Sequence, residues 1–230
     1  MKLKNIALFL LIAAPAFALV NFKAGYTSTQ GELGDRYKGG FGGMIELEIP
    51  LPAHFAIVPM GGYTQLGTDQ QFTDLLNDYI DQYWPPGVPL PAQLQQLGKI
   101  SSSMYFFGGG LRYYPVKNPA VSLYGEVGAG YYYRDMDAQG VPLSLIATAI
   151  PEFSEFAVEP VKGAGIHVDF GLELLSISPL SPQIGARYIH AMGIGQTTVD
   201  DFMAENVPGF IPSKSDNVDL FFVYGGLGIF

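Results

Sequence analysis

Residues 165–174, GIHVDFGLEL, carry the pattern from which the fold of this chain is predicted. Apolar side chains alternate with polar side chains and glycines, and the apolar members are Ile166, Val168, Phe170, Leu172 and Leu174. Successive side chains of a β-strand point to opposite faces, so a period of two predicts a strand with one apolar and one polar face. A helix would instead repeat its apolar residues every three or four positions.

Seven other segments show a comparable β-forming pattern, bounded by proline, glycine and polar residues. The eight predicted strands cover residues 20–28, 38–49, 54–66, 101–114, 121–135, 161–177, 183–196 and 217–230. Each is long enough to cross an outer membrane, for which a tilted strand needs about 9–11 residues. The chain is therefore predicted to be all-β, with eight antiparallel strands.

The connections between these segments alternate in length. The short connections are residues 50–52, 115–119 and 179–182, and the longer ones are residues 29–37, 67–100, 136–160 and 197–216. Outer-membrane barrels have short periplasmic turns and longer external loops, whereas a soluble sandwich has no reason to keep its long loops at one end. We therefore predict a transmembrane β-barrel with apolar faces toward lipid. The alternative is a soluble periplasmic barrel, in which the apolar faces would form the core.

The first eighteen residues have the composition of an export signal. Lys2 and Lys4 precede the apolar run 6–14, and residues 16–18 read Ala-Phe-Ala. This run is shorter than the roughly 20 residues that a membrane-spanning helix needs. We predict a signal peptide over 1–18, cleaved after Ala18, followed by one barrel domain over 19–230 in the outer membrane.

The charge of the chain argues against nucleic acid as a partner. Removing residues 1–18 takes away two lysines and no acids, which lowers the formal net charge from −9 to −11. Binding to a polyanion depends on lysine and arginine that neutralise phosphates. The chain also has no cysteine, so we expect no disulfide and no lipoprotein anchor.

Several short stretches resemble the OmpA/OmpX-type family of small outer-membrane barrels. They are residues 20–26 (VNFKAGY), the glycine-rich 124–131 (YGEVGAGY), 185–188 (GARY) and the terminal Phe230. The resemblance implies insertion by the outer-membrane assembly machinery, with Phe230 in the assembly signal. Gly225 suits the glycine position of that signal, but Gly228 stands where the family usually has an aromatic or apolar residue. The implied roles are envelope integrity, surface adhesion or passage of small solutes, and the fold does not choose among them.

We assign ten charged side chains to the lumen face of the predicted strands: Lys23, Glu46, Glu48, Arg112, Glu126, Arg134, Asp169, Glu173, Arg187 and Asp219. The interior of an eight-stranded barrel is just wide enough for side chains to fill. Because an unpaired buried charge is costly, we expect these groups to pair and close the lumen. The alternative is a gate or a narrow polar path. Tyrosines near predicted strand ends, Tyr188 and Tyr224 among them, are expected in an aromatic belt at the membrane surface.

No catalytic residue, metal site or cofactor is predicted. His190 invites comparison with lipid A deacylases, which use a histidine at the barrel rim with a serine and an acid. The position two residues after His190 is Met192, and a nucleophile needs a hydroxyl within reach of its base. His167 and Asp169 share one face, but two ligands alone are weak evidence for a metal.

The long connections carry apolar residues that are candidates for a ligand site or for a cap over the barrel mouth: Phe72, Leu76, Tyr79, Ile146, Phe153 and Phe210. Residues 69–83 show helical spacing and acidic side chains, which predicts an amphipathic external helix. If the apolar faces pack together they form a cap. If they stay exposed they form a binding site for a hydrophobic ligand, as in OmpW-like barrels.

We therefore expect a monomeric, non-enzymatic barrel with a structural, envelope or surface-interaction role, surrounded by outer-membrane lipid and lipopolysaccharide. The alternative function is a narrow channel for small hydrophobic molecules. A lipid A-modifying enzyme is the third and least favoured hypothesis.

Overall fold

The computed structural model describes residues 19–31, 37, 39–67, 74, 78, 100–118, 120–138, 141–142, 160–174, 180–195 and 217–229. The predicted signal peptide over 1–18, the six predicted loop residues and Phe230 lie outside the described residues. Within the described part, the chain has no helix of the length and hydropathy that a membrane span requires.

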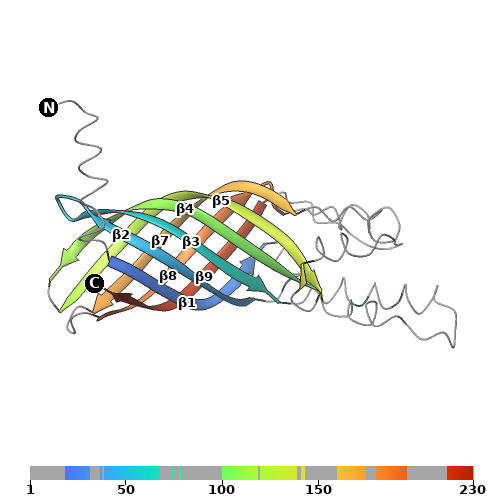
Figure 1. Ribbon diagram of the computed structural model, residues 1–230, viewed down its shortest axis with the longest axis horizontal. Coiled ribbons are helices and arrows are strands. Elements are labelled where there is room, and N and C mark those ends of the chain that lie inside the picture. Colours follow the sequence, from blue (N-terminus) through green and yellow to red (C-terminus); the bar gives the residue numbers. More distant parts are fainter. Residues whose placement is uncertain are drawn as a thin grey trace, which may run out of the picture.

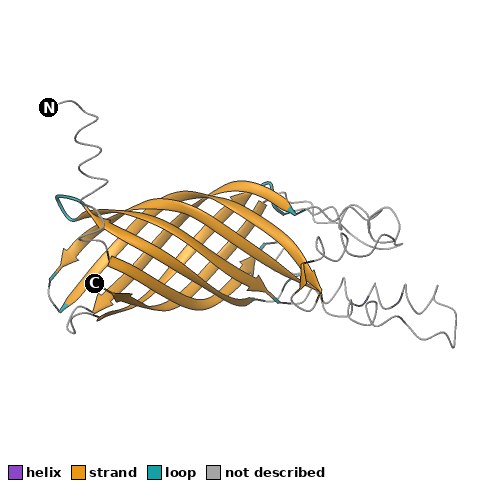
Figure 2. Ribbon diagram, in the orientation of Figure 1, coloured by secondary structure: helices purple, strands orange, loops and turns teal. Residues whose placement is uncertain are grey.

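Antiparallel strands make up the described fold (Figure 2). They are β1 (Leu19–Gln30), β2 (Gly40–Pro50), β3 (Phe55–Leu66), β4 (Ile100–Lys117), β5 (Val121–Ala138), β6 (Val141–Pro142), β7 (Val161–Leu174), β8 (Leu180–Met192) and β9 (Asn217–Ile229). The two-residue β6 only extends the end of β5 by pairing with Asp137 and Ala138. The other eight strands correspond one to one to the predicted segments.

These eight strands close into a barrel. Their order around the ring is β4-β3-β2-β1-β9-β8-β7-β5, and an additional β4–β5 pairing joins its two ends. The β1–β9 pairing runs from Val20 opposite Ile229 to Gln30 opposite Asp219, so the first and last strands are neighbours. Figure 1 shows the strands crossing the cylinder obliquely, as closure of a sheet requires. The predicted eight-stranded antiparallel barrel is confirmed.

The two faces of each strand differ as the alternation predicts. In β7, Ile166 and Phe170 point outward and are 54% and 66% exposed, whereas Asp169 between them points inward and is 0% exposed. In β2, Ile45 is likewise exposed and Glu46 is buried. A soluble barrel would bury the first set and expose the second. The outer surface is therefore the apolar face, as in membrane barrels.

The short turn between β2 and β3 comprises residues 51–54, slightly later than predicted. Ala53 and His54 both have positive φ values, of 60° and 65°. Two consecutive residues in the left-handed region let the chain reverse within a short loop. A hydrogen bond of 2.7 Å from Leu51 N to Phe55 O closes the turn.

The barrel interior has two zones. Toward the end with the long connections is an apolar zone, in which most of the large buried side chains are apolar and lie among smaller polar ones. The apolar side chains include Leu66, Met104, Ile189, Val218, Leu220 and Phe222. From the middle toward the end with the short turns it holds most of the buried charges. This charged zone positions the candidate site.

Candidate functional site

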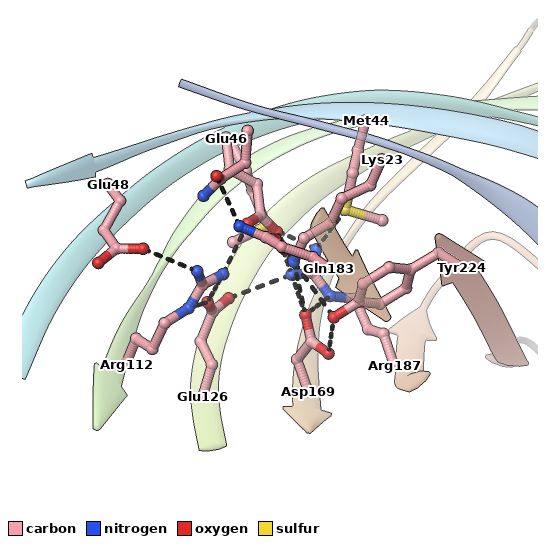
Figure 3. Close-up of polar contacts among 12 residues, drawn as sticks. Lys23, Met44, Glu46, Glu48, Arg112, Glu126, Asp169, Gln183, Arg187 and Tyr224 are labelled. Atoms are coloured by element: carbon pink, nitrogen blue, oxygen red, sulfur yellow. Dashed lines mark hydrogen bonds and ion pairs between the residues drawn. The ribbon is translucent and has the colours of Figure 1, made fainter. Parts of the chain in front are cut away.

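The candidate site is a network of charged side chains in the lumen, contributed by strands from all around the ring (Figure 3). The structure places nine of the ten predicted lumen charges in the interior: Lys23, Glu46, Glu48, Arg112, Glu126, Arg134, Asp169, Glu173 and Arg187. Each lies at an inward position of its strand, where side-chain alternation sends every second residue. The remaining residue, Asp219, is on the other face.

Arg187 of β8 contacts three carboxylates. Its Nη2 lies 2.6 Å from Glu46 Oε1, 2.6 Å from Asp169 Oδ2 and 3.3 Å from Glu126 Oε1. Its Nη1 contacts two thioether sulfurs, those of Met44 at 3.1 Å and Met60 at 2.9 Å. The guanidinium group therefore has charge-assisted contacts on one edge and polarizable apolar contacts on the other.

Arg112 of β4 forms a second hub. It donates from Nη2 to Glu46 at 2.6 Å, from Nε to Glu126 at 2.9 Å and from Nη1 to Glu48 at 3.0 Å. Its guanidinium carbon lies 4.2 Å from the centre of the Tyr124 ring, which adds a cation–π contact. Glu46 and Glu126 thus each contact both arginines.

Lys23 of β1 completes the network. Its Nζ lies 2.8 Å from Glu46 and 3.3 Å from Asp169. It also donates to the hydroxyl oxygens of Tyr124 and Tyr224, each at 3.2 Å. The Tyr224 hydroxyl donates to Asp169 Oδ1 at 2.6 Å and lies 2.5 Å from the Tyr124 hydroxyl. The buried hydroxyl groups of Tyr124 and Tyr224 therefore form hydrogen bonds with Lys23 or Asp169 in addition to the ion pairs.

The three tyrosines of the network, Tyr114, Tyr124 and Tyr224, are not among the ten charged residues assigned to the lumen, and the prediction of Tyr224 in the aromatic belt is wrong. Tyr224 is 2% exposed and points into the lumen. Alternation carried a signal for the other two, because Tyr124 stands two residues before Glu126 and Tyr114 two residues after Arg112. The inward positions of β9 hold no charged residue, so its sequence offered no such marker for Tyr224.

Glu46, Glu126 and Asp169 bring carboxylate oxygens within 4.8 Å of one another. Three carboxylates at this spacing repel each other strongly in a buried site, and such a group can attract a metal ion. Here three protein cations, Lys23, Arg112 and Arg187, lie among them. The protein's own cations therefore compensate this trio, and we assign it to ion pairing.

His167 and Asp169 do not form a joint site, although both face the lumen. The Nε2 atom of His167 lies 3.1 Å from Glu126 Oε1, whereas Asp169 pairs with Lys23 and Arg187. The histidine is a buried member of the network.

Arg134 lies apart from this network, nearer the end with the long connections. It donates from Nε to Ser102 Oγ at 2.8 Å and from Nη1 to the carbonyl oxygens of Ile194 and Gly195 at 2.9 and 2.8 Å. Its guanidinium carbon lies 5.0 Å from the centre of the Tyr37 ring. Arg134 thus holds the chain that leaves β8 against the apolar zone of the lumen.

The assignment of Asp219 to the lumen is wrong. Its side chain is 34% exposed on the outer face, while its neighbours Val218 and Leu220 fill the interior. It accepts hydrogen bonds from the Tyr188 hydroxyl at 2.6 Å and pairs with His190 Nδ1 at 2.7 Å. The physical reason is position: near the rim of the barrel the outer face reaches the polar interface, and there a carboxylate with partners is tolerated.

No protein-family model and no curated protein matches the chain. Among solved structures, the chain is similar to Neisserial surface protein A, with a TM-score of 0.52 and 12% identity over 92% of this chain and 96% of that one. Ail of Yersinia pestis matches with a TM-score of 0.40 and 16% identity, over 92% and 97% of the two chains. OprG of Pseudomonas aeruginosa matches with a TM-score of 0.42 and 9% identity, over 93% and 96%.

Identities this low show the fold and not the role. The chain has the fold of the bacterial outer-membrane β-barrels. Within that class its fold is the small, eight-stranded antiparallel barrel.

Proposed function

We propose that this protein is a monomeric, non-enzymatic barrel of the bacterial outer membrane, with a closed lumen and a structural, envelope or surface-interaction role. The observation that carries the proposal is that lumen side chains meet across the full width of the barrel. Its surroundings would be outer-membrane lipid and lipopolysaccharide, and the outer-membrane assembly machinery would insert it.

Two contacts show how the lumen is spanned. Lys23 of β1 donates to Tyr124 of β5, and these strands are four places apart in a ring of eight. Arg187 of β8 contacts Met60 of β3, which again is four places away. Four places in a ring of eight is the opposite wall. Side chains from opposite walls therefore touch, which supports a lumen closed to water at this level.

The apolar zone closes the lumen a second time. Leu66, Met104 and Val218 come from β3, β4 and β9, and each is 0% exposed. Arg134, Ser102 and Thr64 are buried at the same end, and Arg134 would repel a cation that entered this zone. Conduction would require both zones to open together.

If the lumen is closed, a binding partner would contact the outside of the barrel or its connections. The connections between β3 and β4, between β5 and β7, and between β8 and β9 all leave from the same end of the barrel. Long connections held together on a rigid scaffold are the usual location of binding surfaces. This arrangement supports a surface-interaction role.

The apolar zone is also the observation that favours the second candidate, a narrow channel for small hydrophobic molecules. Such a solute would find apolar partners between Leu66 and Leu220, but it would still have to pass the charged network. Catalysis has less support. The described partner of His190 is Asp219, and both lie on the outer face beside lipid-facing Met192.

Reconstitution of the purified barrel tests the proposal. We expect no single-channel conductance in planar bilayers and no accelerated uptake of small polar or apolar solutes into liposomes. Heat-modifiable gel migration checks that the sample is a closed barrel, and a general porin reconstituted in parallel checks the assay. Stable conductance or solute uptake by the folded sample would refute the closed-lumen proposal.

A further inference from the structure

One acidic pair in the lumen has only Arg112 of the network as a counter-charge. Glu48 of β2 and Glu173 of β7 lie at the end of the lumen with the short turns. The hydroxyl oxygen of Tyr114 is 2.7 Å from Glu48 Oε2 and 2.8 Å from Glu173 Oε1. A phenol has one proton, so it can donate to only one of these carboxylates at a time.

Counting charges isolates the same pair. Five carboxylates of the network face its three cations, Arg134 lying apart, and these cations lie closest to Glu46, Glu126 and Asp169. Arg112 Nη1 reaches Glu48 at 3.0 Å but is 3.6 Å from Glu173. The ammonium of Lys117 lies 4.8 Å from the centre of the Tyr114 ring, at the mouth. The pair therefore carries excess negative charge.

The pair is also the part of the network that retains contact with solvent. The Glu48 and Glu173 side chains keep 7% and 4% of their surface accessible. Those of Glu46, Glu126 and Asp169 keep 0%. Of the carboxylates in the network, Glu48 and Glu173 are therefore the two that solvent reaches.

A second and independent observation is the presence of unpartnered oxygens on both sides of Glu173. Ser122 stands directly opposite Glu173 on β5, and Gln183 stands directly opposite it on β8. Both are buried, and neither Ser122 Oγ nor Gln183 Oε1 has a hydrogen-bond partner, although Gln183 Nε2 donates to Asn21 Oδ1 at 2.7 Å and to Glu173 Oε1 at 3.5 Å. Directly paired side chains on one face have Cβ atoms about 5 Å apart, so both flank the Glu173 side chain. Buried polar atoms without partners are rare and point to a missing ligand.

We propose that the barrel binds one divalent cation of the Ca²⁺ type between Glu48 and Glu173. Hard divalent cations take carboxylate, amide and hydroxyl oxygens as ligands, and this set is what surrounds the pair. A proton shared by the two carboxylates would reduce the charge but leave Ser122 Oγ and Gln183 Oε1 without partners. A water molecule would supply partners but leave the charge. A cation accounts for both observations, and it would bind whether or not the lumen conducts.

Calcium binding to the full-length barrel tests the proposal. The protein is refolded in an uncharged detergent free of lipopolysaccharide, stripped with a chelator and titrated with Ca²⁺ in a calorimeter. We expect wild type to bind Ca²⁺ and to unfold at a higher temperature in its presence, because a ligand that binds only the folded state stabilises it. Glu173→Gln should weaken the affinity about tenfold or more, because the number of charged ligands sets calcium affinity.

Matched variants separate this site from other acidic groups. Asp219→Asn removes a carboxylate on the outer face and should leave the affinity unchanged. Glu48→Gln and Ser122→Ala change the site from two other strands and should both weaken binding, so the test stands even if Glu173→Gln fails to fold. Two results would overturn the proposal: no calcium effect on wild type, or a calcium effect that all three lumen variants retain in full.

Discussion

The substitution Arg187→Met tests how far the lumen network stabilises the fold. The guanidinium group lies 2.6 Å from both Glu46 and Asp169 and 3.3 Å from Glu126. Removing it leaves three carboxylates, already desolvated, with only Lys23 and Arg112 as counter-charges. Methionine keeps much of the side-chain length and adds a third thioether beside Met44 and Met60, so the cavity created is small.

The expected loss in the free energy of unfolding follows from the buried carboxylates that lose their partner. Breaking a buried ion pair by removing one partner costs about 3–5 kcal/mol, because the remaining charge stays buried. We expect Arg187→Met to lower the free energy of unfolding by about this amount. Asp219→Asn is the control. Its carboxylate is a third exposed, and partly exposed ion pairs contribute at most about 1 kcal/mol.

Urea titration of the folded protein in lipid vesicles measures these free energies, with heat-modifiable migration reporting the folded fraction. The double variant Arg187→Met/Glu46→Gln should recover part of the loss, because it also removes one unpaired carboxylate. The reasoning would be wrong if Arg187→Met destabilised the barrel no more than Asp219→Asn, or if the double variant lost the sum of both single effects.

Two further predictions concern the outer wall and the strand packing. Ile166→Arg places a cation on the lipid face near the middle of β7 and should lower the free energy of unfolding by about 2–4 kcal/mol. Met192→Arg at the rim should lower it by about 1 kcal/mol or less. Equal losses in vesicle unfolding titrations would contradict the outward orientation of Ile166. Gly25→Ala should destabilise the barrel by about 1–3 kcal/mol, because the new methyl group would meet the backbone of Val223 and Tyr224. Gly225→Ala should be tolerated, because the nearest neighbour of its methyl group would be Gln183 O at 4.0 Å. An unchanged urea midpoint for Gly25→Ala would contradict the close approach of β1 and β9.

The strands were predictable because alternation is a local property. Ile166 and Asp169 reveal opposite faces through their spacing alone, and the length of each segment indicates a membrane crossing. The same rule placed nine of ten charges inside. The assignment of Asp219 to the lumen was wrong because a polar residue near the rim can point to either face of its strand. The assignment of Tyr224 to the aromatic belt was wrong because a tyrosine is compatible with the belt and with the lumen.

The pairing inside the lumen was not predictable, because it depends on closure. Lys23 and Asp169 are 146 positions apart, and Lys23 and Tyr224 are 201 apart. They meet only once β1 pairs with β9 and the ring has a fixed stagger. No local pattern encodes which charge faces which across a cylinder.

The amino-acid sequence alone determined the all-β class, the eight crossings and the inward side of most charged residues, because each follows from a period of two within one strand. The tertiary structure decided which carboxylates have cations, and that Glu48 and Glu173 share one phenol and lack a full set of partners. The physical reason is that a strand sets the direction of its own side chains, whereas the distance between two charges on different strands is set by how all eight strands close.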